Sequence, residues 1–115
     1  MLPRKHRLLA EKDFSRLLRS GRQLSAGPFG LKFAKNGLGA SRIGFAVGVK
    51  VAKRAVVRNL LKRRLREITR KLLPAIAPGY DLLFMARPGS TQLQFKELEE
   101  VVRVLLARTG LLPRT

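Results

Sequence analysis

Residues 50–71 read KVAKRAVVRNLLKRRLREITRK, with ten Lys and Arg side chains against one acid, Glu67. At about 100° per residue on a helix, one arc collects the cations and an amide: Arg58, Asn59, Lys62, Arg63, Arg66 and Arg70. The opposite arc is apolar: Val57, Leu61, Leu65, Ile68 and Leu72. Like charges one turn apart repel by roughly 0.2–0.5 kcal/mol per pair. The pattern therefore predicts a helix that buries one face and presents the other to an anionic partner.

The composition predicts one folded domain with a strong positive field. The chain has 115 residues, a net charge of +18 and 45% hydrophobic residues. That is enough for one core, but too short for a catalytic domain plus a separate binding domain. We expect a single domain over residues 1–115, with a mobile or loosely docked basic arm over 1–10 and a C-terminal tail over 110–115.

The usual partners of such a field are nucleic acid and anionic membrane. The apolar stretches are shorter than the roughly 20 residues that span a bilayer, and the basic helix lacks the Trp or Phe typical of membrane-surface helices. The chain has no cysteine, so disulfides and thiolate metal sites are excluded. No apolar segment typical of a secretion signal follows the basic residues 1–7. These features favour nucleic acid over membrane and a cytoplasmic location.

Shorter elements are predicted on the N-terminal side of the basic helix. Phe14, Leu17 and Leu18 recur with helical spacing, which indicates a helix over about 11–20. Residues 29–34 and 43–49 then alternate large apolar with small or polar side chains, which predicts two strands paired as a hairpin, with a third strand possible over 22–25. One face of this sheet carries Gly, Ala and Lys32, so we expect it to be shallow and open.

On the C-terminal side, Pro74 ends the basic helix, which we expect over about 55–73. The apolar run 80–86 predicts a buried strand. A last helix is expected to start near Thr91, with Thr91 and Gln94 as a capping box, and to end at Gly110. The predicted order is α-β-β-β-α-β-α, a single-domain α+β sandwich with helices on a small sheet.

Residues for protein-borne catalysis are scarce. The one histidine, His6, lies in the basic arm, and the seven acids show no paired spacing. Gly37 and Gly39 belong to a turn and are not followed by the Lys-Ser or Lys-Thr of a phosphate-binding loop. We therefore predict no catalytic residue and no metal site in the protein itself.

Residues 53–66 resemble the hallmark helix of the bacterial ribonuclease P protein subunit, which reads Arg-Asn-Arg followed by Lys-Arg and a further Arg. Residues 8–14, 42–49 and 80–87 resemble the same family's first helix, central strand and late strand ending in Ala-Arg-Pro. The resemblance implies an RNA-binding domain with a small mixed sheet and a left-handed β-α-β crossover, an arrangement called ribosomal protein S5 domain 2-like. Sequence rules alone would favour a right-handed crossover.

The resemblance also implies a function: a non-catalytic subunit that helps a catalytic RNA remove the 5′ leader of precursor tRNA. The Mg²⁺ is then bound mainly by the RNA, and no membrane or obligate protein partner is expected. Together with the charge pattern, it places the contacts to ribonuclease P RNA on Lys50, Lys53, Arg54, Arg58, Asn59, Lys62, Arg63 and Arg66. The leader is expected in a cleft between the first helix and the open sheet face, at Phe14, Leu18, Lys32, Gly44, Ala46 and Gly48.

Two departures from the family pattern limit this transfer. Position 60 is Leu where the hallmark has Arg, and Leu18 and Lys32 stand where many members carry aromatics. We expect leader binding here to depend more on charge than on stacking. Two alternatives share the charge and size: a small ribosomal or other structural RNA-binding protein, and a DNA-binding module with its basic helix in a major groove.

Overall fold

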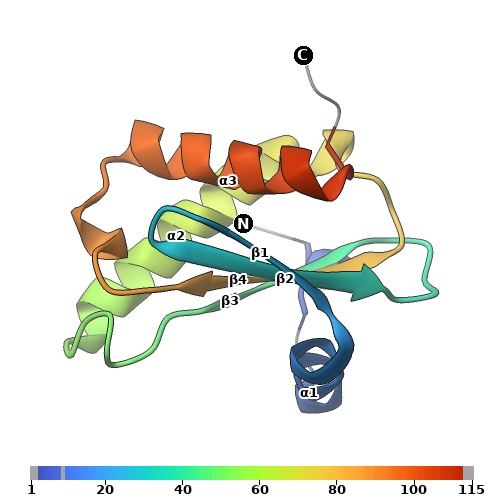
Figure 1. Ribbon diagram of the computed structural model, residues 1–115, viewed down its shortest axis with the longest axis horizontal. Coiled ribbons are helices and arrows are strands. Elements are labelled where there is room, and N and C mark those ends of the chain that lie inside the picture. Colours follow the sequence, from blue (N-terminus) through green and yellow to red (C-terminus); the bar gives the residue numbers. More distant parts are fainter. Residues whose placement is uncertain (1–2, 9, 113–115) are drawn as a thin grey trace.

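A computed structural model describes residues 3–8 and 10–112 of the chain. Its helices and strands follow the predicted order (Figure 1). In chain order they are η1 (Arg4–His6), α1 (Glu11–Ser20), β1 (Arg22–Ala26), β2 (Phe29–Lys35), β3 (Arg42–Ala46), α2 (Ala55–Leu72), η2 (Leu73–Ala75), β4 (Tyr80–Ala86), η3 (Ser90–Gln92) and α3 (Phe95–Thr109). Figure 1 shows α2 and α3 on one face of the sheet and α1 on the other.

The four strands form one mixed sheet in the order β1-β2-β4-β3. The hairpin predicted between residues 29–34 and 43–49 is wrong, because β4 lies between β2 and β3. The hairpin is instead formed by β1 and β2 around Gly27, whose φ of 53° suits glycine. The third strand predicted over 22–25 is thereby confirmed, and β3 ends at Ala46 rather than at residue 49.

The composition of β4 explains its central place. Leu82 and Phe84 point into the main core, while Leu83 is buried on the opposite face, so both faces of this strand need cover. β4 pairs in parallel with β3, and α2 connects these two strands over the face of the main core (Figure 1). The main core is closed by the apolar face of α2, with Leu61, Leu65 and Ile68 buried as their spacing predicts.

The last helix starts later than predicted. Its capping box is made by Gln94 and Glu97, with the Gln94 amide N–H donating to Glu97 Oε1 at 2.8 Å. Thr91 lies in η3 instead, where a short 3₁₀ turn precedes the cap. Gly110 ends the helix in the left-handed region, as predicted.

Both terminal segments are docked more firmly than we expected. In the described part of the basic arm, Leu8 is 3% exposed and its amide N–H donates to the Ile43 carbonyl at 3.0 Å. At the other end, Leu111 and Leu112 are buried in the main core. Each segment is held in place by its own apolar side chains, which cover an edge of the core. The remaining predicted tail residues, 113–115, and residues 1, 2 and 9 of the arm lie outside the described residues.

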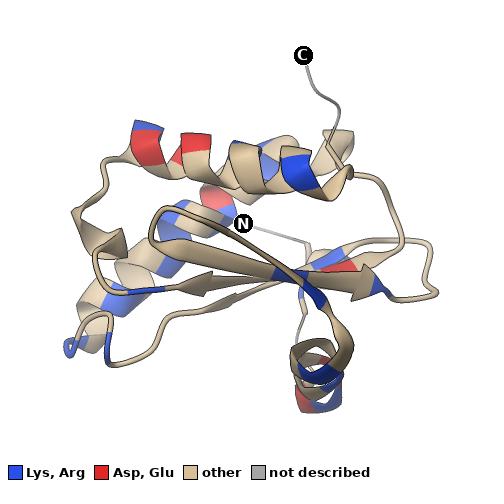
Figure 2. Ribbon diagram, in the orientation of Figure 1, with Lys and Arg blue, Asp and Glu red and all other residues tan. Residues whose placement is uncertain are grey.

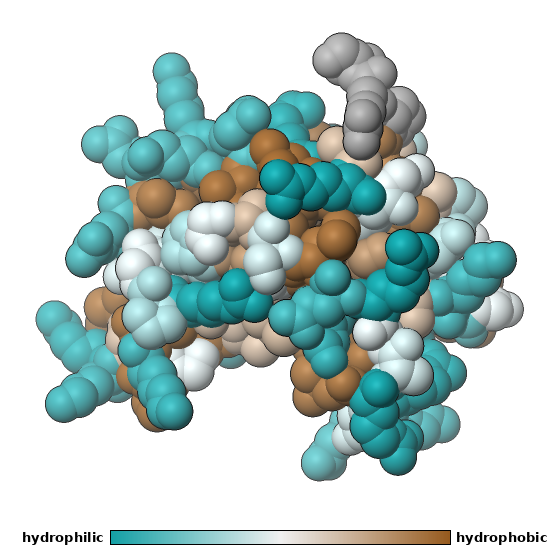
Figure 3. Space-filling model, in the orientation of Figure 1, coloured by the Kyte–Doolittle hydropathy of each residue, from teal (hydrophilic) through white to brown (hydrophobic). Residues whose placement is uncertain are grey.

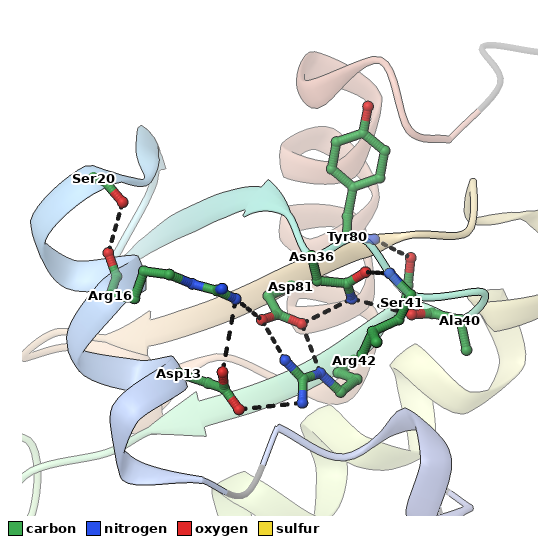
Figure 4. Close-up of polar contacts among 10 residues, drawn as sticks. Asp13, Arg16, Ser20, Asn36, Ala40, Ser41, Arg42, Tyr80 and Asp81 are labelled. Carbon is green, nitrogen blue, oxygen red and sulfur yellow. Dashed lines mark hydrogen bonds and ion pairs between the residues drawn. The ribbon is translucent and has the colours of Figure 1, made fainter.

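A buried carboxylate joins α1 to the sheet (Figure 4). Asp81 on β4 is 1% exposed and accepts two hydrogen bonds from Arg42 on β3, each at 2.8 Å. Arg16 on α1 donates to Asp81 at 3.2 Å, and Asn36 donates at 3.0 Å. Arg42 also pairs with Asp13 of α1 at 3.2 Å. The hydrogen bond to Asp81 is the largest cause that raises the pKa of Arg42 above its ordinary value.

Replacing Arg42 tests how far the fold depends on this cluster. Arg42→Ala leaves Asp81 buried without its principal partner, so we expect the free energy of unfolding to fall by about 3–5 kcal/mol in urea titrations. Arg70→Ala removes an arginine whose partner, Glu67, is solvent-exposed, and should leave the stability nearly unchanged. Equal stability of the two variants would contradict a structural role for Arg42.

Candidate RNA interface

The polar face of α2 lies opposite the core and is cationic. Asn59 and Arg63 are exposed, and Lys62 and Arg66 are partly exposed. Lys and Arg recur along α2 and in the loop before it. Most of the acidic residues close to α2 lie on α3 (Figure 2). The amphipathic pattern of residues 50–71 therefore produces a continuous basic surface.

Arg58 differs from its neighbours because its guanidinium is engaged within the protein. Its Nη1 donates to the Ala52 carbonyl at 2.9 Å and to the Lys53 carbonyl at 2.8 Å. These bonds fix the loop that leads into α2, which carries the exposed Lys50, Lys53 and Arg54. Arg58 thus holds other cations in place, in addition to contributing its own charge.

The start of α2 adds to the positive potential. Arg54 occupies the N-cap, and the first turn of the helix contains no acidic side chain. The unpaired amide groups of a helix N-terminus attract anions. Further along, the acid Glu67 pairs with Arg70 at 2.6 Å, which lowers the pKa of Glu67 and raises that of Arg70. The acid is therefore neutralised locally and does not interrupt the basic face.

The second predicted surface is the sheet face on the side of α1. Phe14 of α1 packs over Gly44, where a Cβ atom would lie 3.0 Å from the ring. Leu18, one turn later, is exposed, and Lys32 Nζ donates to the Leu18 carbonyl at 2.6 Å. Phe14, Leu18 and Lys32 are therefore brought together, and Ala46 lies exposed at the end of β3.

Two residues predicted for this surface have other positions. Gly44 is buried beneath Phe14 and Leu8, so its role is to let α1 approach the sheet. Gly48 lies in the loop beyond β3, because the strand ends at Ala46. Neither residue shares the exposed part of the sheet face with Lys32 and Ala46.

Sequence reasoning missed two side chains on this face. Met85 and Arg87 flank Gly30, where a Cβ atom would lie 2.7 Å from Arg87 Nη2 and 3.1 Å from the Met85 methyl group. Arg87 Nη1 also donates to Ser25 Oγ at 3.1 Å. The alternation of β4 could have identified both, since residues 83, 85 and 87 point to the same side of a strand. The open face thus has a second cation besides Lys32.

The described residues offer no ready metal site: within 3–8 and 10–112, no three His, Asp or Glu side chains gather. The buried carboxylates of Asp13 and Asp81 are already paired with arginines. Their oxygens are therefore committed to the fold rather than open to a cation. No helix in the described part of the chain is long and apolar enough to cross a membrane.

Comparison with known proteins identifies the family to which the chain belongs. The family model of ribonuclease P matches residues 2–110. The ribonuclease P protein component of Roseiflexus castenholzii is 41% identical, over 95% of this chain and 89% of that protein. The corresponding protein of a Synechococcus species is 39% identical, over 100% of this chain and 90% of that protein.

Solved structures agree with these sequence matches. The ribonuclease P protein of Thermotoga maritima has 33% identity and a TM-score of 0.81, covering 89% of this chain and 96% of that one. The protein of Staphylococcus aureus, at 22% identity, shares the fold with a TM-score of 0.86, covering 94% of this chain and 98% of that one. The sequence matches decide between the alternatives left open above: the chain belongs to the ribonuclease P protein family, as an RNA-binding protein subunit of this tRNA-processing endoribonuclease.

Proposed function

We propose that the cationic face of α2 binds the catalytic RNA of ribonuclease P, while the open sheet face binds the 5′ leader of precursor tRNA. The active site then lies in the RNA, which holds most of the Mg²⁺ required for cleavage. The observation that carries this proposal is the basic face of α2 and its loop. The setting we propose is the cytoplasm, with the RNA and precursor tRNA as partners.

The geometry of α2 suits a structured RNA. Eighteen residues extend about 27 Å at 1.5 Å per residue, enough to follow several successive phosphates. Lys53, Arg54, Lys62, Arg63 and Arg66 supply charges along that length, and Asn59 can donate to a phosphate or a 2′-hydroxyl. Neutralising phosphates releases counterions, so most of the affinity should depend on salt.

The open sheet face suits a single strand better than a duplex. Lys32 and Arg87 provide two cations beside the apolar surface of Leu18 and Met85, and α1 borders this surface. Phe14 is half-buried against Gly44, so its ring is partly used in packing. This arrangement supports binding through charge and apolar contact, with limited base stacking.

Reconstitution tests the proposal as a whole. With bacterial ribonuclease P RNA at low Mg²⁺, the protein should stimulate release of the leader from a precursor tRNA, measured on denaturing gels. The protein without the RNA should cleave nothing, because the proposal places the active site in the RNA. Equal cleavage by the RNA with and without protein would contradict the proposal.

A charge-matched pair of double variants tests the α2 interface. Lys62→Ala with Arg63→Ala should flatten the slope of log affinity against log salt by about 2, because two phosphate contacts are lost. Lys96→Ala with Arg103→Ala removes the same charge from exposed positions on α3 and should leave the slope nearly unchanged. Filter binding to ribonuclease P RNA at several salt concentrations gives both slopes. Equal slopes for the two variants would place the RNA elsewhere.

Two lysines on one strand test the leader surface. Lys32→Ala should weaken binding of leader-bearing precursor tRNA by the RNA–protein complex about tenfold, since a charged hydrogen bond contributes about 1.5 kcal/mol. Lys35→Ala is the control, because residue 35 points to the other side of β2. Mature tRNA should bind equally to all three complexes. A loss of mature tRNA binding with Lys32→Ala would argue against a leader contact.

A further inference from the structure

Two exposed apolar side chains lie at the edge of the cationic face of α2. Val56 is 62% exposed and Leu60 is 39% exposed, one helical turn apart. At about 100° per residue, Val56 lies opposite the buried Leu65, whereas Leu60 lies about 100° from the buried Leu61, at the edge of the solvent-facing surface. Residues four apart on a helix are neighbours, so Val56 and Leu60 form one patch.

Polar residues that can bind RNA border this patch on its cationic side. Asn59 is three residues from Val56, and Arg63 is three residues from Leu60, so each borders the patch on the helix surface. Lys53 and Arg54 lie just before the helix starts. Figure 3 shows hydrophobic atoms exposed among hydrophilic ones at the end of the molecule where α2 begins.

The surroundings of the patch identify its occupant. A single exposed Leu needs no explanation, but a pair bordered by cations matches a partner that alternates anionic groups with apolar surface. RNA has this character, since phosphates flank ribose carbons and the faces of unstacked bases. A protein partner would need acidic side chains around an apolar centre, and the proposed function already places the catalytic RNA on this helix.

We propose that Val56 and Leu60 contact the apolar face of a ribose or an unstacked base in the catalytic RNA. This inference rests on the proposed RNA interface of α2. It assigns to Leu60, which stands where the family hallmark has Arg, an apolar contact in place of a phosphate contact. Such a contact releases no counterions, so its contribution to affinity does not depend on salt.

The salt dependence of Leu60 variants separates the two kinds of contact. Leu60→Ala should weaken binding to ribonuclease P RNA about five- to tenfold at every salt concentration, with an unchanged slope, because it removes buried methylene surface. Leu60→Arg should steepen the slope by about 1, so that it binds more tightly than the wild type at low salt and more weakly at high salt.

Leu38→Ala is the matched control, since Leu38 is 52% exposed in the turn between β2 and β3, at the opposite end of β3 from α2. It should bind like the wild type. Leu60 also borders Thr91 and Leu93 in a small hollow, so urea unfolding of each variant checks for a packing role. If Leu60→Ala lowers stability, Val56→Ala, at the more exposed position, provides the measurement of binding instead.

The possible failures are distinguishable. If the Lys62 and Arg63 double variant keeps the wild-type slope, the α2 interface itself is wrong. If that variant flattens the slope but Leu60→Ala and Val56→Ala bind like the wild type, only the apolar contact is overturned. A Leu60→Arg variant that binds more tightly than the wild type at every salt concentration, with no crossing, would also overturn it.

Discussion

The buried carboxylate of Asp81 is the interaction on which the arrangement of this protein depends. A carboxylate that is 1% exposed is tolerated only with strong partners, and it has Arg42, Arg16 and Asn36 around it. These partners come from β3, α1 and the end of β2, so one charge fixes α1 against the sheet. Since α1 is held at that end, the rest of the sheet face, with Lys32, stays open.

The excess positive charge is divided between structure and binding. Arg16 and Arg42 are used within the fold, and Arg58 fixes the loop before α2 through two backbone carbonyls. The cations that remain exposed, such as Lys53 and Arg63, repel one another in the free protein. A polyanionic partner converts this repulsion into attraction. The same side-chain type therefore supports both the fold and the proposed interface, and the presence or absence of an acceptor within the protein separates the two roles.

Local patterns in the sequence predicted much of the fold, but not the arrangement of the strands. The two-faced helix, the buried strand 80–86 and the end at Gly110 follow from spacing and turn chemistry within a few residues. The placement of β4 between β2 and β3 is a long-range choice, visible only as apolar residues on both faces of one strand. The pairing of Asp81 with Arg42 likewise joins positions 39 residues apart. Gly44 was predicted as a binding residue because its contact with Phe14 cannot be read from either segment alone.

The two proposed RNA surfaces lie on opposite sides of the sheet, and the end of β3 connects them. Ala46 is exposed on the side of α1, and Lys50, only four residues later, belongs to the basic loop before α2. Arg58 holds the later part of that loop through the Ala52 and Lys53 carbonyls. A catalytic RNA seated on α2 would therefore lie close to a leader seated on the sheet. The short path between these surfaces would let the protein position the substrate against the active site that we propose for the RNA.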